Sequence, residues 1–101
     1  MSEDELPILP DHPGTVLRRR LAPFHRSTAA IARMLGLSRQ TLHEIMAGKQ
    51  AITPGVALRI AKLTGTSAEM WLNLQQAHDL AIARFKSREL LTKVPSLEER
   101  W

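Results

Sequence analysis

Apolar residues recur at intervals of three or four positions through most of the chain, a spacing typical of amphipathic helices. The first such stretch contains Leu17 and Leu21, follows Pro13 and stops before Pro23. Proline is tolerated in the first turn of a helix but interrupts it further along. Asp11 precedes the stretch, and we expect its carboxylate to cap the helix. The pattern therefore predicts a first helix that begins near Pro13 and ends within two residues of Pro23.

Two short helices separated by a tight turn are predicted next. Ser27 is a favourable N-cap for the first of them, and Gly36 can adopt the left-handed conformation that ends it. Ser38 provides another N-cap shortly afterwards, and the following helix runs to about Ala47, where Gly48 closes it. Apolar positions in both segments gather on one face, so the two helices are expected to share a core.

A fourth helix and a longer fifth helix complete the pattern. Thr53 and Pro54 repeat the combination of cap and proline, Gly65 ends the fourth helix, and Thr66 or Ser67 is expected to cap the fifth. The apolar stripe of the fifth helix consists of Met70, Trp71, Leu74, Ala77, Ala81, Ile82 and Phe85. No segment shows the alternation of a strand. The sequence therefore predicts an all-α fold with five helices, of which the last is long.

Composition fits a single folded domain. The chain has 101 residues, of which 44% are hydrophobic and 24% charged. We expect a flexible acidic arm at residues 1–11, a helical domain at residues 12–91 and a loosely ordered tail at residues 92–101. Cysteine is absent, which excludes disulfides and thiolate metal sites and suits a reducing compartment. With no signal peptide pattern and no stretch approaching roughly 18 apolar residues, a soluble cytoplasmic protein is expected.

The net charge of +4 is unevenly distributed. Residues 1–11 contain four acidic side chains and no basic one, whereas residues 12–67 contain nine basic side chains and a single acidic one, Glu44. Nine minus one gives the middle segment a charge of +8, and residues 68–101 balance at five of each sign. A basic segment inside a folded region is expected of a protein that binds the phosphate backbone of nucleic acid. A solvated cationic surface without such a partner gives the same count.

The strongest indication of function lies in residues 28–47, TAAIARMLGLSRQTLHEIMA. Two short helices joined by a turn of a few residues form the helix-turn-helix arrangement, whose second helix can enter the major groove of DNA. Ala32 is small where the two helices are expected to cross, and Gly36 allows the positive φ of the turn. Leu42 and Ile45 are expected to point inward, which leaves the opposite face of the second helix free to contact bases.

The outward face of this second helix carries side chains that can read bases. Arginine pairs with guanine O6 and N7, glutamine with adenine N6 and N7, and glutamate accepts from cytosine N4. Phosphate contacts are expected beside it, from the N–H groups and hydroxyl around Ser27 and Thr28, from the Thr41 hydroxyl, and from Lys49 after Gly48. A solvated helix surface is the alternative. The predicted DNA-binding residues are Ser27, Thr28, Ser38, Arg39, Gln40, Thr41, His43, Glu44 and Lys49.

The stretch LGLSRQTLHEIMAGKQAIT resembles the lambda-repressor-like (XRE-type) helix-turn-helix family. HPGTVL near the start, the segment SRQTLHEIMAGKQAITPGVALRIAKLTGTSAEMWLNLQQAHDLA and the acidic arm are together similar to HigA-type antitoxins, over roughly residues 12–84. The resemblance implies a lambda-repressor-like fold and a DNA-binding antitoxin that neutralises a HigB-type ribosome-dependent mRNA endonuclease. It also implies repression of its own operon as a dimer. Thr15, Ala29 and His78 depart from residues common in the family, which are acidic, glutamine and aromatic, respectively.

A single helix-turn-helix makes few contacts with DNA, so a two-fold dimer on half-sites about one DNA turn apart is expected. The fifth helix is predicted to contribute, with Trp71, Leu74 and His78 as core residues or dimer contacts. The acidic arm could contact a basic toxin, although terminal acidic residues are commonly solvated without a partner. The predicted partners are therefore double-stranded operator DNA, a HigB-type toxin and a second copy of the chain, and no membrane.

An enzyme is not expected from this sequence. Its four histidines, His12, His25, His43 and His78, include no metal-type pair three or four positions apart, and no glycine-rich phosphate loop or nucleophile motif is present. No cofactor, metal or catalytic residue is therefore predicted. Two other functions stay open, namely a stand-alone transcriptional regulator with no toxin partner and a protein-interaction module that has lost DNA binding. A neighbouring gene for a small ribonuclease-like protein would favour the antitoxin over the stand-alone regulator.

Overall fold

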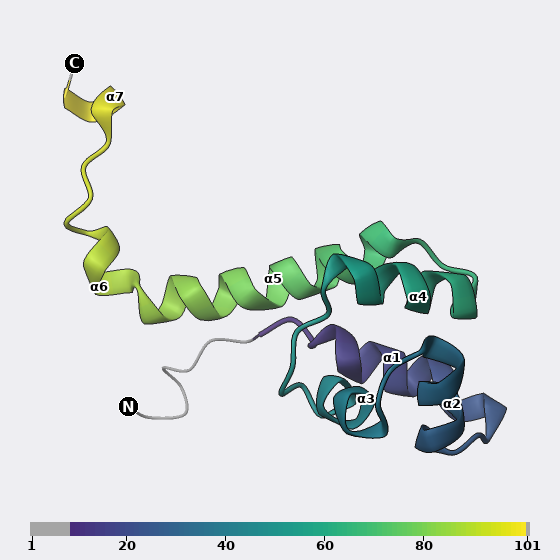
Figure 1. Cartoon of the computed structure of the whole chain (residues 1–101). Helices are drawn as coiled ribbons and strands as arrows, with labels where there is room; N and C mark the ends of the chain where they lie inside the picture. The colour runs from purple at the N-terminus through teal and green to yellow at the C-terminus, as the bar shows by residue number, and fades with distance from the viewer. Residues whose placement is uncertain (1–8, 101) are drawn as a thin grey trace.

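The computed structural model describes residues 9–100, with side chains as far as residue 98, and all regular secondary structure in this part is helical (Figure 1). The elements, in chain order, are α1 (Pro13–Leu21), the 3-10 helix η2 (Ala22–Phe24), α2 (Thr28–Leu35), α3 (Arg39–Met46), α4 (Pro54–Thr64), α5 (Ala68–Lys86), α6 (Arg88–Leu91) and α7 (Leu97–Arg100). Helices α1 to α5 are the five predicted ones, so the all-α fold with a long fifth helix is confirmed. The short elements η2, α6 and α7 are additional, and α7 lies within the segment predicted to be loosely ordered. Most of the predicted acidic arm, residues 1–8, lies outside the described residues.

Side chains cap four helices where the sequence predicts them. Ser27, Ser38, Thr53 and Ser67 each accept a hydrogen bond from the backbone N–H three residues further along, at the starts of α2 to α5. Each bond satisfies one of the N–H groups that a helix leaves free at its N-terminus. Of the two candidates at the start of α5, the cap is therefore Ser67 and not Thr66.

The N-cap of α1 is His12, so the prediction that Asp11 caps this helix is wrong. His12 Nδ1 accepts a hydrogen bond from the backbone N–H of Gly14 at 2.9 Å. Asp11 lies one residue too early for this bond, and its carboxylate pairs instead with Arg19 Nη2 at 2.7 Å on the surface. The first turn of α1 therefore depends on an imidazole nitrogen, which accepts a hydrogen bond only while it is unprotonated.

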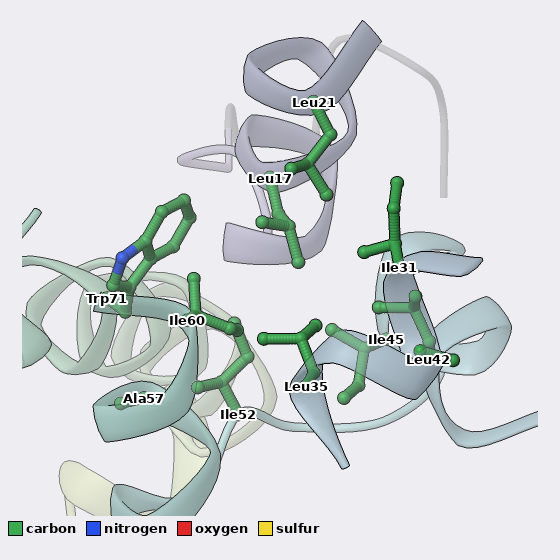
Figure 2. Close-up of a cluster of buried hydrophobic side chains, with 11 residues drawn as sticks. Leu17, Leu21, Ile31, Leu35, Leu42, Ile45, Ile52, Ala57, Ile60 and Trp71 are labelled. Carbon is green, nitrogen blue, oxygen red and sulfur yellow. The ribbon is translucent and has the colours of Figure 1, made fainter. Parts of the chain in front are cut away.

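Side chains from the first five helices meet in one hydrophobic core (Figure 2). Leu17 of α1, Leu42 and Ile45 of α3, Ile60 of α4 and Trp71 of α5 are all fully buried. Burying a side chain of this size contributes about 1.5–3 kcal/mol relative to leaving it exposed. The core therefore holds the α2–α3 pair against α1, α4 and α5 as one unit.

Helices α1 and α3 approach each other closely at Gly14. A methyl group at this position would overlap the carbonyl oxygen of Ile45 and lie 2.6 Å from its carbonyl carbon. Only glycine, which has no Cβ, fits against backbone at this distance. The start of α1 is thereby fixed against the last turn of α3.

Helix α5 continues beyond the compact part of the molecule, as Figure 1 shows. Its buried residues, Trp71 and Gln75, both lie in the first half, and no described residue after Gln75 is buried. The Cα radius of gyration is accordingly 17.3 Å, against about 13 Å for a compact chain of this length. Although α5 is long, neither it nor any other helix in the described part of the chain is apolar and long enough to cross a membrane.

Candidate nucleic-acid interface

The turn between α2 and α3 is held by backbone and side-chain hydrogen bonds. Gly36 adopts a φ of 69°, which is the left-handed conformation predicted for it. Leu37 N–H donates to Ala32 O at 2.9 Å, and from α4 the Arg59 guanidinium donates to Gly36 O at 2.9 Å. Arg59, which the sequence shows only as one of nine basic side chains, therefore anchors the turn that positions α3.

Helix α3 buries one side and exposes the other. Leu42 and Ile45 are 0% exposed, as predicted for the inward face. Arg39, Gln40 and His43 are exposed on the other side, where they line a hollow of about 510 Å³. Positions i, i+1 and i+4 lie within little more than one helical turn. The structure therefore brings three of the predicted DNA-binding residues together on an open surface.

Two pairs of side chains orient other predicted residues on α3. Gln40 Nε2 donates to Glu44 Oε1 at 2.8 Å, which leaves the Gln40 amide oxygen and its second N–H available to a base edge. Ser38 Oγ donates to Thr41 Oγ1 at 2.8 Å and accepts from Thr41 N–H at 3.0 Å. Both hydroxyls therefore serve the start of α3 itself, and any contact with DNA would add to that role.

Apart from Thr41 on α3, the predicted phosphate-contacting residues lie at the start of α2 and just after α3. Ser27 is exposed while it caps α2, and Thr28 begins that helix. Gly48 follows the end of α3 with a φ of 75°, and the side chain of Lys49 is exposed. Lys49 N–H donates to Glu44 O at 2.8 Å, so its backbone is attached to the last turn of α3.

Known proteins share this arrangement of helices. The helix-turn-helix family model matches residues 17–71, which is more than half of the chain. The chain belongs to the helix-turn-helix family. Virulence-associated protein I of Dichelobacter nodosus is 34% identical over 94 residues, which cover 92% of this chain and 85% of that protein.

Two solved structures match most of the chain. An addiction module antidote protein of the HigA family from Coxiella burnetii has a TM-score of 0.81 and 36% identity, covering 88% of this chain and 98% of that one. Pseudomonas aeruginosa antitoxin HigA with the higBA promoter has a TM-score of 0.82 and 34% identity, covering 87% and 98%. The similarity to HigA-type antitoxins that the sequence indicates is thereby confirmed.

The three α5 residues predicted as core residues or dimer contacts all pack within this helix-turn-helix chain. Trp71 is 0% exposed, and its indole N–H donates to Thr66 Oγ1 at 2.7 Å. Leu74 is half-buried against the core, and His78 Nδ1 lies 2.8 Å from Pro10 O. Trp71 has no exposed surface and therefore belongs to the core, whereas its part in a dimer contact stays a prediction.

His12 has surroundings that the pattern of the helix-turn-helix sequence does not reveal. It is 8% exposed, and its ring makes a T-shaped contact with His78, with centroids 5.1 Å apart. Burial lowers the pKa of His12 below its usual 6.5, the nearby His78 lowers this pKa further, and Asp79 opposes both. The sequence feature that could have indicated the capping role of His12 is HPG, residues 12–14. Its side-chain acceptor stands two residues before the N–H of Gly14, as in an N-cap.

Proposed function

We propose that this chain is the DNA-binding antitoxin of a toxin–antitoxin pair, which represses its own operon as a homodimer and neutralises a HigB-type mRNA endonuclease. The observation that carries the proposal is the open face of α3 with Arg39, Gln40 and His43. The similarity to a HigA antitoxin solved with a promoter supports it. The function is binding rather than catalysis, uses no cofactor or metal, and takes place in the bacterial cytoplasm, where operator DNA is found.

In this proposal α3 lies in the major groove, which admits an α-helix and presents a distinct pattern of donors and acceptors for each base pair. Arg39, at the start of α3, pairs with O6 and N7 of a guanine. Gln40 offers its amide to N6 and N7 of an adenine, while Glu44 holds one end of that amide. His43, one turn further along, meets the next base pair or its phosphate.

Phosphate contacts hold the reading helix in register. The free N–H groups and partial positive charge at the start of α2, around Ser27 and Thr28, favour a phosphate there. Lys49, which lies just after the C-terminal end of α3, contacts a second phosphate. These contacts fix the position of α3 without selecting a sequence, since phosphates are the same along the duplex.

We assign the dimer contact to the outer half of α5. Ile82 and Phe85 are apolar, lie one helical turn apart and are only half-buried within the chain. Arg88 lies over the Phe85 ring, 4.3 Å from its centroid. A second copy packed along this face would cover the apolar surface that the rest of the chain leaves open. Such a dimer would present two α3 helices to half-sites about one DNA turn apart.

The DNA-binding part is tested by titrating the protein against its own upstream DNA and against a scrambled duplex, at two salt concentrations. We expect a preference of about a hundredfold or more for the upstream DNA and an affinity that falls steeply with salt. Equal, weak binding to both duplexes would mean that α3 does not read bases, and the protein-interaction module would become the better hypothesis.

Two substitutions in the same titration separate reading from anchoring. Arg39→Ala is expected to cost about 1–3 kcal/mol on the upstream DNA and to relax the preference at one base pair. Lys49→Ala is expected to weaken binding to upstream and scrambled DNA alike and to lower the salt slope by about one. The role of Arg39 would be contradicted if its substitution weakened both duplexes to the same extent.

The antitoxin part is tested by coexpression with a small ribonuclease-like protein encoded beside this gene. We expect the toxin alone to arrest growth and the full chain to restore it. A variant lacking residues 2–9 then tests the acidic arm, because unchanged neutralisation would exclude the arm as a toxin contact. If no such neighbouring gene exists, the stand-alone regulator becomes the better assignment.

A further inference from the structure

The ring of His12 lies where α1, α5 and the end of α3 meet. On the α1 side its Nδ1 accepts the hydrogen bond from Gly14 N–H at 2.9 Å. On the α5 side it contacts the His78 ring. On the third side it faces Gly48, where an added methyl group would lie 3.6 Å from His12 Cγ. Since Gly48 directly precedes Lys49, His12 lies one methyl group away from the backbone that carries the predicted phosphate anchor.

The cap of α1 and the end of α3 also share one backbone group. The Ile45 carbonyl lies so close to Gly14 that a Cβ there would overlap it, and its oxygen accepts from Gly48 N–H at 3.0 Å. A displacement of the first turn of α1 therefore disturbs the carbonyl to which Gly48 is bonded. This shared carbonyl, together with the proximity of the ring to Gly48, connects the state of His12 to the position of Lys49.

We propose that His12 is a positioning residue for DNA binding, which holds Lys49 in place while its ring is neutral and releases it when the ring is protonated. This inference rests on the proposed function and adds a dependence on pH to it. The residue acts through Gly48 and Lys49 and makes no contact with DNA itself.

Protonation acts on the α1 cap directly. A proton on Nδ1 turns the acceptor into a donor that faces Gly14 N–H, so the capping bond is lost. It also places a positive charge beside His78, with Asp79 as the opposing charge on α5. The other two neighbours of the ring, Gly14 and Gly48, are uncharged and cannot compensate.

The direction of the pH effect follows from the lowered pKa of His12. A histidine released from the site has its ordinary pKa of 6.5, so below this pH the released ring binds a proton that the packed ring does not bind. Falling pH therefore favours the released state. His12 therefore keeps Lys49 in position above about pH 6.5, and this effect weakens as the pH falls below that value.

The test compares binding to the upstream DNA at pH 7.5 and pH 5.5 for the wild type and His12→Asn. Asparagine is a good N-cap that does not titrate. The wild type is expected to lose about three- to tenfold in affinity at the lower pH, within the limit of about tenfold per pH unit for one proton. Its salt slope is expected to fall by about one as Lys49 leaves its phosphate. His12→Asn is expected to show neither change.

His25→Asn is the matched control, because it also removes an imidazole. His25 is exposed and has a φ of 52°, a conformation that asparagine tolerates. This variant is expected to keep the wild-type pH profile.

A second readout uses the free protein and needs no DNA. The backbone amide signals of Gly48 and Lys49 are expected to shift with pH together with the His12 ring signals in the wild type, and to stay constant in His12→Asn. The inference would be overturned if the Gly48 and Lys49 amide signals did not shift together with the His12 ring signals. It would also be overturned if His12→Asn and the wild type lost the same affinity at the lower pH. A wild type that fails to prefer its upstream DNA at pH 7.5 would instead remove the proposed function, and the amide signals would still decide the coupling.

Discussion

Replacing Gly14 with alanine is expected to lower the free energy of unfolding by about 3 kcal/mol or more, at the upper end of the range for overpacked cores. The added methyl group would overlap the Ile45 carbonyl oxygen and lie 2.6 Å from the carbonyl carbon and 3.1 Å from His12 Nδ1. Because the Ile45 atoms are backbone inside a helix, the clash is relieved only if α1 moves away from α3. That movement would weaken the α1 cap and the packing of Leu17. Urea unfolding followed by circular dichroism at one fixed protein concentration measures the loss.

Gly55 provides a matched control, because it occupies the same position in α4 that Gly14 occupies in α1. Each is the second residue of its helix and follows a proline, Pro13 or Pro54. A Cβ at Gly55 would meet no atom within 4 Å. Gly55→Ala is therefore expected to stabilise the protein by about 0.4–1 kcal/mol, through the lower entropy of the unfolded chain. Equal effects of the two substitutions would show that the close approach at Gly14 does not determine the fold.

The helices could be predicted from the sequence because their ends are set by local interactions. Ser27 and Ser38 bond to N–H groups three residues away, and Gly36 ends α2 through its own φ. None of these depends on a distant part of the chain. The role of Gly14 is set by Ile45, which meets it only in the folded chain, so no local pattern marks this glycine as different from Gly55.

The residues of the candidate site also fall into two groups, those that a local pattern predicts and those whose role depends on a distant part of the chain. Arg39 and His43 could be placed on the outer face of α3 because they follow the helical period away from buried residues. The sequence counts Arg59 and Arg19 with the charges available to DNA, but the structure uses Arg59 at the Gly36 carbonyl and Arg19 in an ion pair. A total charge cannot separate these uses, since each depends on a partner brought close by folding. For the same reason the pattern does not indicate that His12 lies beside the end of α3.

Replacing Trp71 with alanine is expected to lower the free energy of unfolding by about 3–5 kcal/mol, the range for truncating a large buried aromatic side chain. The indole is 0% exposed among core residues from the other helices, and truncation would leave a cavity between α5 and its neighbours (Figure 2). The sequence left Trp71 as either a core residue or a dimer contact, and the two roles give different results. A core residue changes the stability of each copy, whereas a dimer contact changes the concentration at which copies associate.

Trp71→Phe separates these outcomes, because it keeps an aromatic ring in the core and removes the hydrogen bond to Thr66 together with only part of the indole. Thr66 Oγ1 also lies 2.7 Å from Thr64 Oγ1, so it keeps a partner and the expected loss is only about 1–2 kcal/mol. Unfolding of both variants is compared at one protein concentration, since association alone stabilises a folded dimer. Sedimentation of folded Trp71→Phe across a range of concentrations is expected to match the wild type. A shift towards monomer at unchanged stability would return Trp71 to the dimer interface and remove it from the core that supports α3.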